Sequence, residues 1–98
     1  MSLTRIVRGV ASDEIKDAAR WYERRVAGDG RLFSAEVRRV MGDIMVQPLS
    51  YAVAHGDIRQ VPVGRFPYCV YSRALASRII VVGVVHNARD PSVWQGRR

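Results

Sequence analysis

Hydrophobic residues recur at helical spacing through much of the first half of the chain. Ile15, Ala18, Ala19 and Tyr22 lie three or four positions apart, which predicts a helix over Ser12 to Val26. Charged side chains fill the positions between them, as expected for a helix with one buried face.

The residues before this helix predict its start and a preceding strand. Ser12 is a common capping residue, and we expect Asp13 and Glu14 in the first turn, where the helix dipole favours anions. Leu3 to Val10 alternate loosely between apolar and polar positions and predict a first strand.

A second amphipathic helix follows a short turn. The sequence "GDG", Gly28 to Gly30, predicts the turn, and Pro48 is expected to end the helix. The apolar positions at helical spacing are Phe33, Val37, Val40, Met41 and Ile44. Two such helices with a short connection predict an antiparallel hairpin that shares one apolar face.

Three strands are predicted after this hairpin, over Ile58 to Val63, Tyr68 to Arg73 and Arg78 to His86. The stretch "PLSYAVAHGD" before them is expected to be a loop. Pro62 cannot donate a hydrogen bond to a neighbouring strand, so its strand should lie at an edge or carry a bulge.

The last of these strands contains the run "IIVVGVV", which is apolar on both faces and predicts a buried, central strand. The expected order is therefore β-α-α-β-β-β. This order predicts an α+β fold, a mostly antiparallel sheet with an N-terminal helical hairpin on one face, in a single domain over residues 1–98.

Charge changes the picture of possible partners. The 98 residues include 16 Lys and Arg against 9 Asp and Glu, a formal net charge of +7, and Lys16 is the only lysine. Such a field attracts polyanions, and arginine suits nucleic acid or an acidic protein. An arginine bias from a GC-rich genome, with merely solvated charges, explains the composition equally well.

Other features favour a soluble cytoplasmic protein. Cys69 is the only cysteine, so no intramolecular disulfide can form, as is usual in a reducing compartment. No signal peptide is recognisable at the start, and the longest apolar run, Ile79 to Val85, is too short to span a bilayer. We expect no membrane association.

The candidate functional residues lie on the three later strands or at their ends. They are Arg59, Arg65, Tyr68, Tyr71, Arg73, His86 and Arg89. The two-residue period of a strand predicts that Ile80, Val82, Val84 and His86 share one face, which places His86 at the rim of the sheet's free face. His86 can act as an acid or a base, but a lone histidine is more often structural, bonded to a backbone carbonyl at a strand end.

Arg89 and Trp94 also allow two interpretations each. Arg89 can pair with Asp90 or bind a phosphate, and Trp94 either packs the C-terminal segment onto the body or, less commonly, stacks on a base. Tyr68 and Tyr71 should point to opposite faces of their strand. Cys69 is expected in the core. The helix aromatics Trp21, Tyr22 and Phe33 are expected to pack in the core or within the hairpin.

Several chemistries have no support in the sequence. Two histidines and one cysteine form no metal-ligand pattern, so no metal is expected. The glycine-rich nucleotide motifs and the GxSxG motif of hydrolases do not occur, and no cofactor is expected.

The second half of the chain resembles a known family. The run "HGDIRQVPVGRFPYCVYSRALASRIIVVGVVHNARDPSVW" is similar to the C-terminal half of RelE/ParE-superfamily toxins and plasmid stabilisation proteins. The shared features are an "IR" strand, "FPY" followed by "VY", a hydrophobic strand, and then "H", "RDP" and "W". The helical hairpin resembles the first half of the family, with its alanine-rich helix, "G" and "F" spacing and terminal proline.

This resemblance implies a compact α+β toxin of a type II toxin–antitoxin module, neutralised by a cognate antitoxin whose extended segment wraps the toxin. It also implies one of two targets. RelE-like members cut mRNA on the ribosome without metal, and ParE-like members inhibit DNA gyrase by binding. A noncatalytic module that binds gyrase or another protein, or an inactive relative kept as the partner of an antitoxin, are the alternatives.

For a nuclease, the chemistry needs an acid, a base and cations around the phosphate. We assign His86 as acid or base and Tyr68 as the orienting hydroxyl. The expected phosphate clamps are Arg65, Arg73 and Arg89, and the expected RNA-binding residues are Arg59, Arg65 and Arg89.

The chain departs from the pattern of RelE itself at three positions. Tyr68 and Ala88 stand where that protein has arginines, and Trp94 stands where it has a terminal tyrosine. Arg89 is one place beyond Ala88, so a shift of one residue would restore that arginine. The resemblance therefore supports a toxin more strongly than a ribonuclease.

Overall fold

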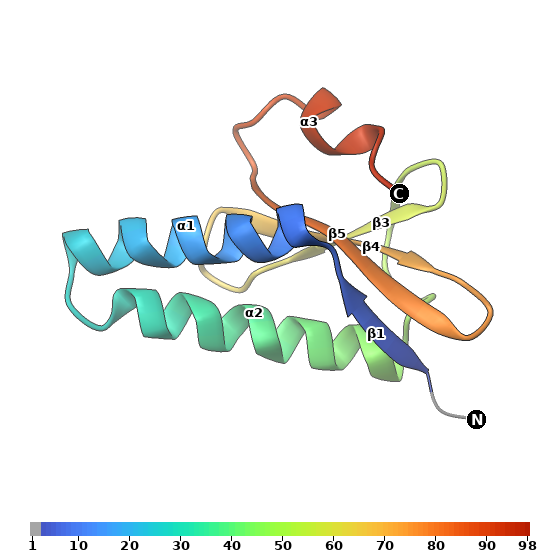
Figure 1. The fold of residues 1–98 in the computed structure, drawn as a ribbon, viewed down its shortest axis with the longest axis horizontal. Coiled ribbons are helices and arrows are strands. Elements are labelled where there is room, and N and C mark those ends of the chain that lie inside the picture. Colours follow the sequence, from blue (N-terminus) through green and yellow to red (C-terminus); the bar gives the residue numbers. More distant parts are fainter. Residues whose placement is uncertain (1–2) are drawn as a thin grey trace.

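Eight elements follow one another in the computed structural model, which describes residues 3–98 (Figure 1). Their bounds are β1 (Thr4–Val7), α1 (Gly9–Arg25), α2 (Asp29–Val46), β2 (Val53–His55), β3 (Ile58–Pro62), β4 (Tyr68–Ala74), β5 (Arg78–His86) and α3 (Ser92–Gln95). The strands form one sheet in the order β1-β5-β4-β3-β2. Only β1 and β5 run parallel. The predicted α+β fold with a mostly antiparallel sheet is confirmed.

The strand β5 forms the centre of the sheet, between β1 and β4. Every residue from Ile79 to Val85 is buried. The strand has β4 along one edge and β1 along the first part of the other, and side chains pack on both of its faces, so its sequence must be apolar throughout. The prediction of a buried central strand, including buried Ile80 and Val82, is confirmed.

The helical hairpin covers one face of this sheet, as predicted. Side chains of α2 meet those of β4 and β5 in a core that includes Phe33, Val37, Val70 and Val81. Figure 1 shows both helices running together along the sheet, joined by a short turn at one end. In that turn Gly28 has a φ of 93°, a left-handed conformation that glycine adopts without strain.

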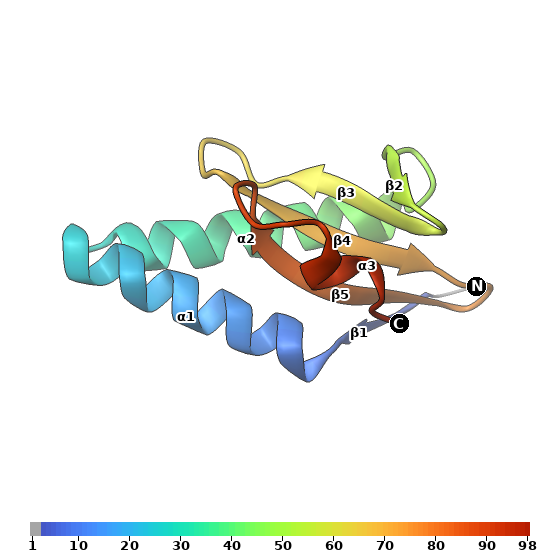
Figure 2. The same cartoon turned by 90° about the horizontal axis from the view of Figure 1, so that it is seen from above.

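The opposite face of the sheet is not free, which corrects our expectation. The short helix α3 lies across it, and Figure 2 shows this helix over β5 and β4. Trp94 is buried there and stacks on Tyr71, with 4.0 Å between ring centroids. Cys69 belongs to the same cluster. The expected roles of Trp94 in packing the C-terminal segment and of Cys69 in the core are confirmed.

A β-bulge in β5 changes which residues share a face. Tyr71 pairs with Gly83 but Ser72 pairs with Val81, so Val82 has no partner in β4. As a result Ile80 and Val82 face the α3 side, while Val84 faces the helical hairpin. Our prediction that these residues share one face with His86 is wrong, because the extra residue reverses the alternation.

Glu14 and Arg97 replace a missing strand beside this bulge. The strand β1 ends at Val7, opposite Val81, so the later part of β5 has no neighbour on that edge. The Val84 N–H instead donates to Glu14 Oε1 at 3.0 Å. Arg97 makes two hydrogen bonds to the Glu14 carboxylate, at 2.8 and 3.0 Å, and one to the Val82 carbonyl, at 3.1 Å.

The start of α1 also differs from the prediction. The helix begins at Gly9, three residues before Ser12, and no side chain caps it. The expected strand over Leu3 to Val10 is correspondingly shorter, since Arg8 N–H already bonds to the Val81 carbonyl where β1 pairing ends. Glu14 is thus beyond the first turn, from which it reaches β5.

The predicted loop before β3 contains the short strand β2. Only Ile58 and Arg59 of β3 pair with it, and the register is irregular. The pairing is too brief to leave an alternating pattern in the sequence. Pro62 lies beyond its reach, so among the described residues only β4 is beside Pro62, as expected for an edge position.

The hydrogen bonds of Glu14 to Val84 and Arg97 predict a loss of stability when Glu14 is replaced. Replacing Glu14 by alanine leaves the Val84 N–H without its acceptor and the half-buried Arg97 guanidinium without its carboxylate partner. The free energy of unfolding should fall by about 2 kcal/mol, roughly 8–16 °C in Tm for a domain of this size. Urea denaturation measures it. Asp17→Ala, which removes only an exposed ion pair on the same helix, should cost less than about 1 kcal/mol. Equal losses would contradict the role of Glu14.

Candidate functional site

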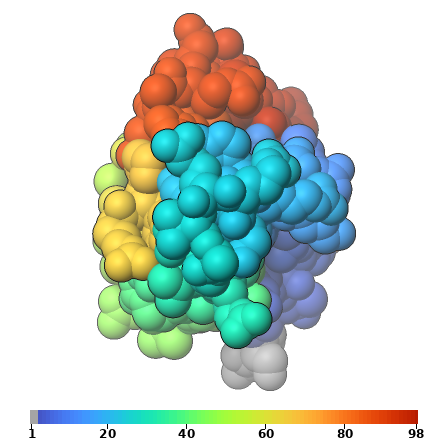
Figure 3. Space-filling view, turned by 90° about the vertical axis from the view of Figure 1, so that its left-hand side faces the viewer, coloured from blue at the N-terminus to red at the C-terminus, as the bar shows by residue number. Residues whose placement is uncertain are grey.

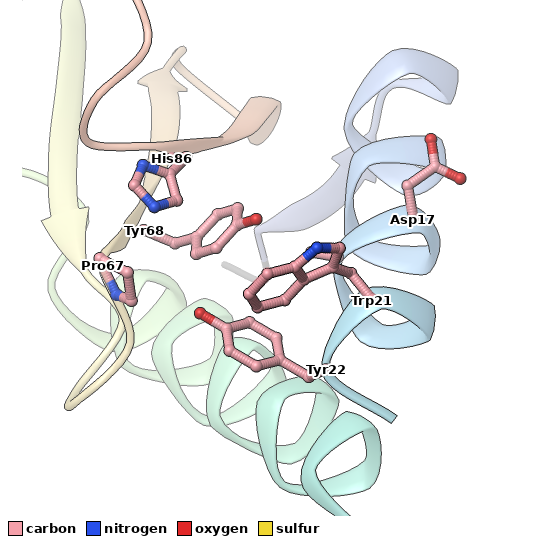
Figure 4. A pocket seen from close by; sticks show the side chains of 7 residues that line it. Asp17, Trp21, Tyr22, Pro67, Tyr68 and His86 are labelled. Carbon is pink, nitrogen blue, oxygen red and sulfur yellow. The ribbon is translucent and has the colours of Figure 1, made fainter. Parts of the chain in front are cut away.

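Aromatic side chains gather at the end of the sheet nearest the hairpin turn. Figure 3 shows this end, with the turn in front, the β3–β4 connection beside it and the C-terminal segment above. A pocket of about 470 Å³ opens here. Its lining residues are Asp17, Ala18, Trp21, Tyr22, Pro67, Tyr68 and His86 (Figure 4).

Edge-to-face contacts hold the rings of this pocket in place. Tyr68 is central: its ring lies 5.1 Å from His86, 5.0 Å from Phe33 and 6.2 Å from Tyr22, centroid to centroid. Tyr22 in turn lies 5.0 Å from Trp21. These distances are typical of attractive aromatic pairs, so the pocket has a rigid aromatic wall.

The hydroxyl of Tyr68 is in a partly desolvated environment. Burial raises its pKa above the usual tyrosine value, the neighbouring Tyr22 raises it further, and Arg89 opposes the shift. Tyr68 therefore stays a neutral phenol near neutral pH, able to donate a hydrogen bond. It faces the helical side of the sheet and Tyr71 the other, as predicted.

His86 pairs with Tyr68 across β4 and β5 at the open end of the sheet. Its Nδ1 accepts a hydrogen bond from the backbone N–H of Ala88 at 2.9 Å. A neutral His86 therefore carries its proton on Nε2, which forms no hydrogen bond with any residue from 3 to 98. This arrangement combines a local structural role at Nδ1 with a ring nitrogen that is open to a ligand.

Arg89 lies beside the same residues. A smaller hollow of about 160 Å³ adjoins the aromatic pocket and is lined by Arg89 together with Glu14, Asp17, Tyr68 and His86, among others. Of the two alternatives for Arg89, an ion pair with Asp90 does not form within residues 3–98. Asp90 instead accepts from the Ser92 N–H at 2.9 Å, which lowers the Asp90 pKa.

The other three predicted arginines lie elsewhere. Arg73 makes a bidentate ion pair with Asp57, and both hydrogen bonds measure 2.9 Å. It is five residues along β4 from Tyr68, roughly 17 Å away at the rise of a strand. Arg59 donates to the carbonyls of Leu49 and Tyr51, at 3.2 and 2.7 Å.

Arg65 lies in the turn between β3 and β4. Its guanidinium is 5.4 Å from the centroid of Phe66, and it lines a separate hollow with Leu32 and Glu36. The structure therefore brings together Tyr68, His86 and Arg89, but not Arg59, Arg65 and Arg73.

Sequence reasoning missed the contribution of α1 to this site. Trp21 was expected to pack in the core or within the hairpin, yet 46% of its surface is exposed, and Arg25 lies 4.7 Å from its ring centroid. Asp17 precedes it by one helical turn and also lines the pocket. An exposed tryptophan on the polar side of a helix is a detectable signal, but its meeting with β4 depends on helix packing.

No group of three or more His, Cys, Asp or Glu side chains in residues 3–98 is arranged to hold a metal ion. Within the same residues, no helix has the length and apolar character needed to cross a membrane.

No family model matches the sequence, and no curated protein matches it either. A chain in the solved structure of the chromosomal ParDE TA system from P. aeruginosa is similar in structure, with a TM-score of 0.76. This protein therefore has the same fold as the ParDE chain. The similarity covers 86% of this chain and 95% of the ParDE chain, at 9% sequence identity. The RelE/ParE-like fold expected from the sequence is thereby confirmed.

The tyrosines of the two cores predict a loss of stability in alkali. Burial raises the pKa of Tyr22, Tyr68 and Tyr71. A raised pKa in the folded state gives a stabilisation that is complete below the unfolded value, about 10, and lost as pH rises through the folded value. The free energy of unfolding should fall above about pH 10. Urea denaturation at a series of pH values should show a shallower fall of the unfolding free energy with pH for Tyr68→Phe. An unchanged slope would contradict the raised pKa of Tyr68.

Proposed function

We propose that this chain is the toxin of a type II toxin–antitoxin module and arrests growth until a cognate antitoxin binds it. The similarity in fold to a chain of the ParDE TA system, over most of both chains, carries this proposal. The "FPYCVY" and "HNARDP" motifs support it independently, because they lie on β4 and at the end of β5, where the pocket opens.

The test of this proposal is controlled expression in a bacterial host. Induction of the chain alone should stop growth, and co-expression with the product of the adjacent gene should restore it. Unaffected growth at full expression of a soluble, folded chain would overturn the proposal.

The charge of the chain favours an acidic antitoxin segment. With a net charge of +7, capture of such a segment is steered by long-range attraction. At physiological ionic strength, salt largely screens the attraction between exposed charges that lie more than about 8 Å apart. The association rate should therefore fall as salt rises, as stopped-flow mixing can measure. An association rate that is independent of salt would contradict electrostatic capture.

Growth arrest by contact with DNA gyrase, without chemistry, is the mode that the side-chain arrangement favours. Cleavage of a phosphodiester needs several cations around one phosphate. Arg73 is bound to Asp57, and Arg59 is bound to the carbonyls of the loop before β3. Arg65 lines a different hollow. A binding surface, by contrast, needs no such convergence.

Ribosome-dependent mRNA cleavage is the second candidate, and one observation favours it. Tyr68, His86 and Arg89 converge on the rim of one pocket. They provide a neutral phenol, an imidazole with an open Nε2, and a cation, which are groups that a metal-independent nuclease uses.

The variant His86→Ala separates the two modes. For a nuclease, the loss of an acid or base should lower the cleavage rate about 10²–10⁴-fold and abolish growth arrest. For gyrase contact, the variant should still stop growth. Growth after induction and ribosome cleavage in vitro are the measurements.

His55→Ala is the matched control, since His55 is exposed at the far end of the sheet in β2. Its growth arrest should equal that of the unmodified chain. The melting temperature of each purified variant identifies a structural effect: loss of growth arrest together with a large fall in Tm would assign His86 to stability. Full toxicity of His86→Ala would rule out the catalytic role.

A further inference from the structure

Two hollows meet at the candidate site and share four residues. The aromatic pocket and the smaller hollow at Arg89 are both lined by Asp17, Ala18, Tyr68 and His86. Their volumes are about 470 and 160 Å³. A ligand with two chemically different parts can therefore occupy both at once.

The larger hollow suits a planar ring with polar edges. Aromatic side chains form most of its wall, and no lysine or arginine lines it. The hydroxyls of Tyr22 and Tyr68 and the indole N–H of Trp21 form no hydrogen bonds within residues 3–98. Figure 4 shows both hydroxyls directed into the space between the labelled side chains. A ring that stacks on these walls would find donors and acceptors at its edge.

The smaller hollow suits an anion. Its two carboxylates are already paired: Glu14 with Arg97, at 2.8 and 3.0 Å, and Asp17 with Arg20, at 3.2 Å. Arg89 is exposed and has no ion-pair partner among the described residues. Its guanidinium is therefore the uncompensated charge of this hollow, with the geometry that binds phosphate.

We propose that these hollows form a nucleotide-binding site, with the base in the aromatic pocket and the phosphate at Arg89. The net charge of +7 adds long-range attraction for such a ligand. The site accepts a free nucleotide or one nucleotide of a single strand, since both present the same base and phosphate. This inference rests on the proposed function in one respect, because Tyr68, His86 and Arg89 also form the site of the second candidate, mRNA cleavage. The base pocket on α1 and the binding of a free nucleotide go beyond that proposal.

Trp21 provides a direct probe of binding. Its fluorescence should be quenched by AMP, and less by adenosine or inorganic phosphate at equal concentration, because each of these fills one hollow only. Trp94 is buried on the other face of the sheet and should give a constant background. Trp21→Phe should abolish the quenching while calorimetry still detects binding of AMP.

Variants test each half of the site. Trp21→Ala should weaken AMP binding about 5- to 150-fold, the range measured for loss of base stacking. Arg89→Ala should weaken the binding of AMP but not of adenosine. Arg78→Ala is its control, because Arg78 is an exposed arginine at the opposite end of β5 and removes the same charge.

A short single-stranded oligoadenylate distinguishes the two sources of the nucleotide. Tighter binding than AMP points to a strand, and equal binding points to a free nucleotide. The proposal is overturned if neither AMP nor the oligonucleotide quenches Trp21, the result expected if the pocket takes a protein side chain. Equal weakening by Arg78→Ala and Arg89→Ala would also overturn it, as diffuse attraction would then suffice. Growth arrest is measured separately, so the two proposals can fail independently.

Discussion

The edge of β5 beyond Val81 must be satisfied without a neighbouring strand, and the rest of the structure depends on how this is done. Glu14 accepts the Val84 N–H, and Arg97 donates to both Glu14 and the Val82 carbonyl. An unpaired backbone group on a buried strand would cost about 1–3 kcal/mol. One carboxylate thus joins α1, the central strand and the C-terminal segment, three parts that are far apart in sequence.

The β-bulge beside these Glu14 and Arg97 contacts determines the position of the candidate site. Val82 has no partner in β4, and this extra residue shifts the alternation of β5. As a result, Val84 and His86 face the helical hairpin. His86 consequently meets Tyr68 and the aromatic residues of α1, not the surface covered by α3. A regular strand would have placed the imidazole on the opposite face.

The arginines divide into those with internal partners and those without. Arg73 and Arg97 make two-pronged pairs with carboxylates, and Arg59 anchors the segment before β3 through its carbonyls. Such guanidiniums stabilise loops and strand ends, and the charges of Arg73 and Arg97 are compensated by the carboxylates that they bind. Arg89 is different because the acids around it are already engaged by other cations. A net charge alone does not distinguish these cases.

The sequence by itself determined the helical hairpin, the central position of β5, the opposite orientation of Tyr68 and Tyr71 and the packing of Trp94. These features follow from local periodicity and from the burial of apolar side chains. Only the tertiary structure decided the start of α1, the strand β2, the face of His86 and the pairing of Arg59 and Arg73. Each depends on contacts between distant segments, and a single unpaired residue such as Val82 reverses a strand's faces without changing its apolar composition.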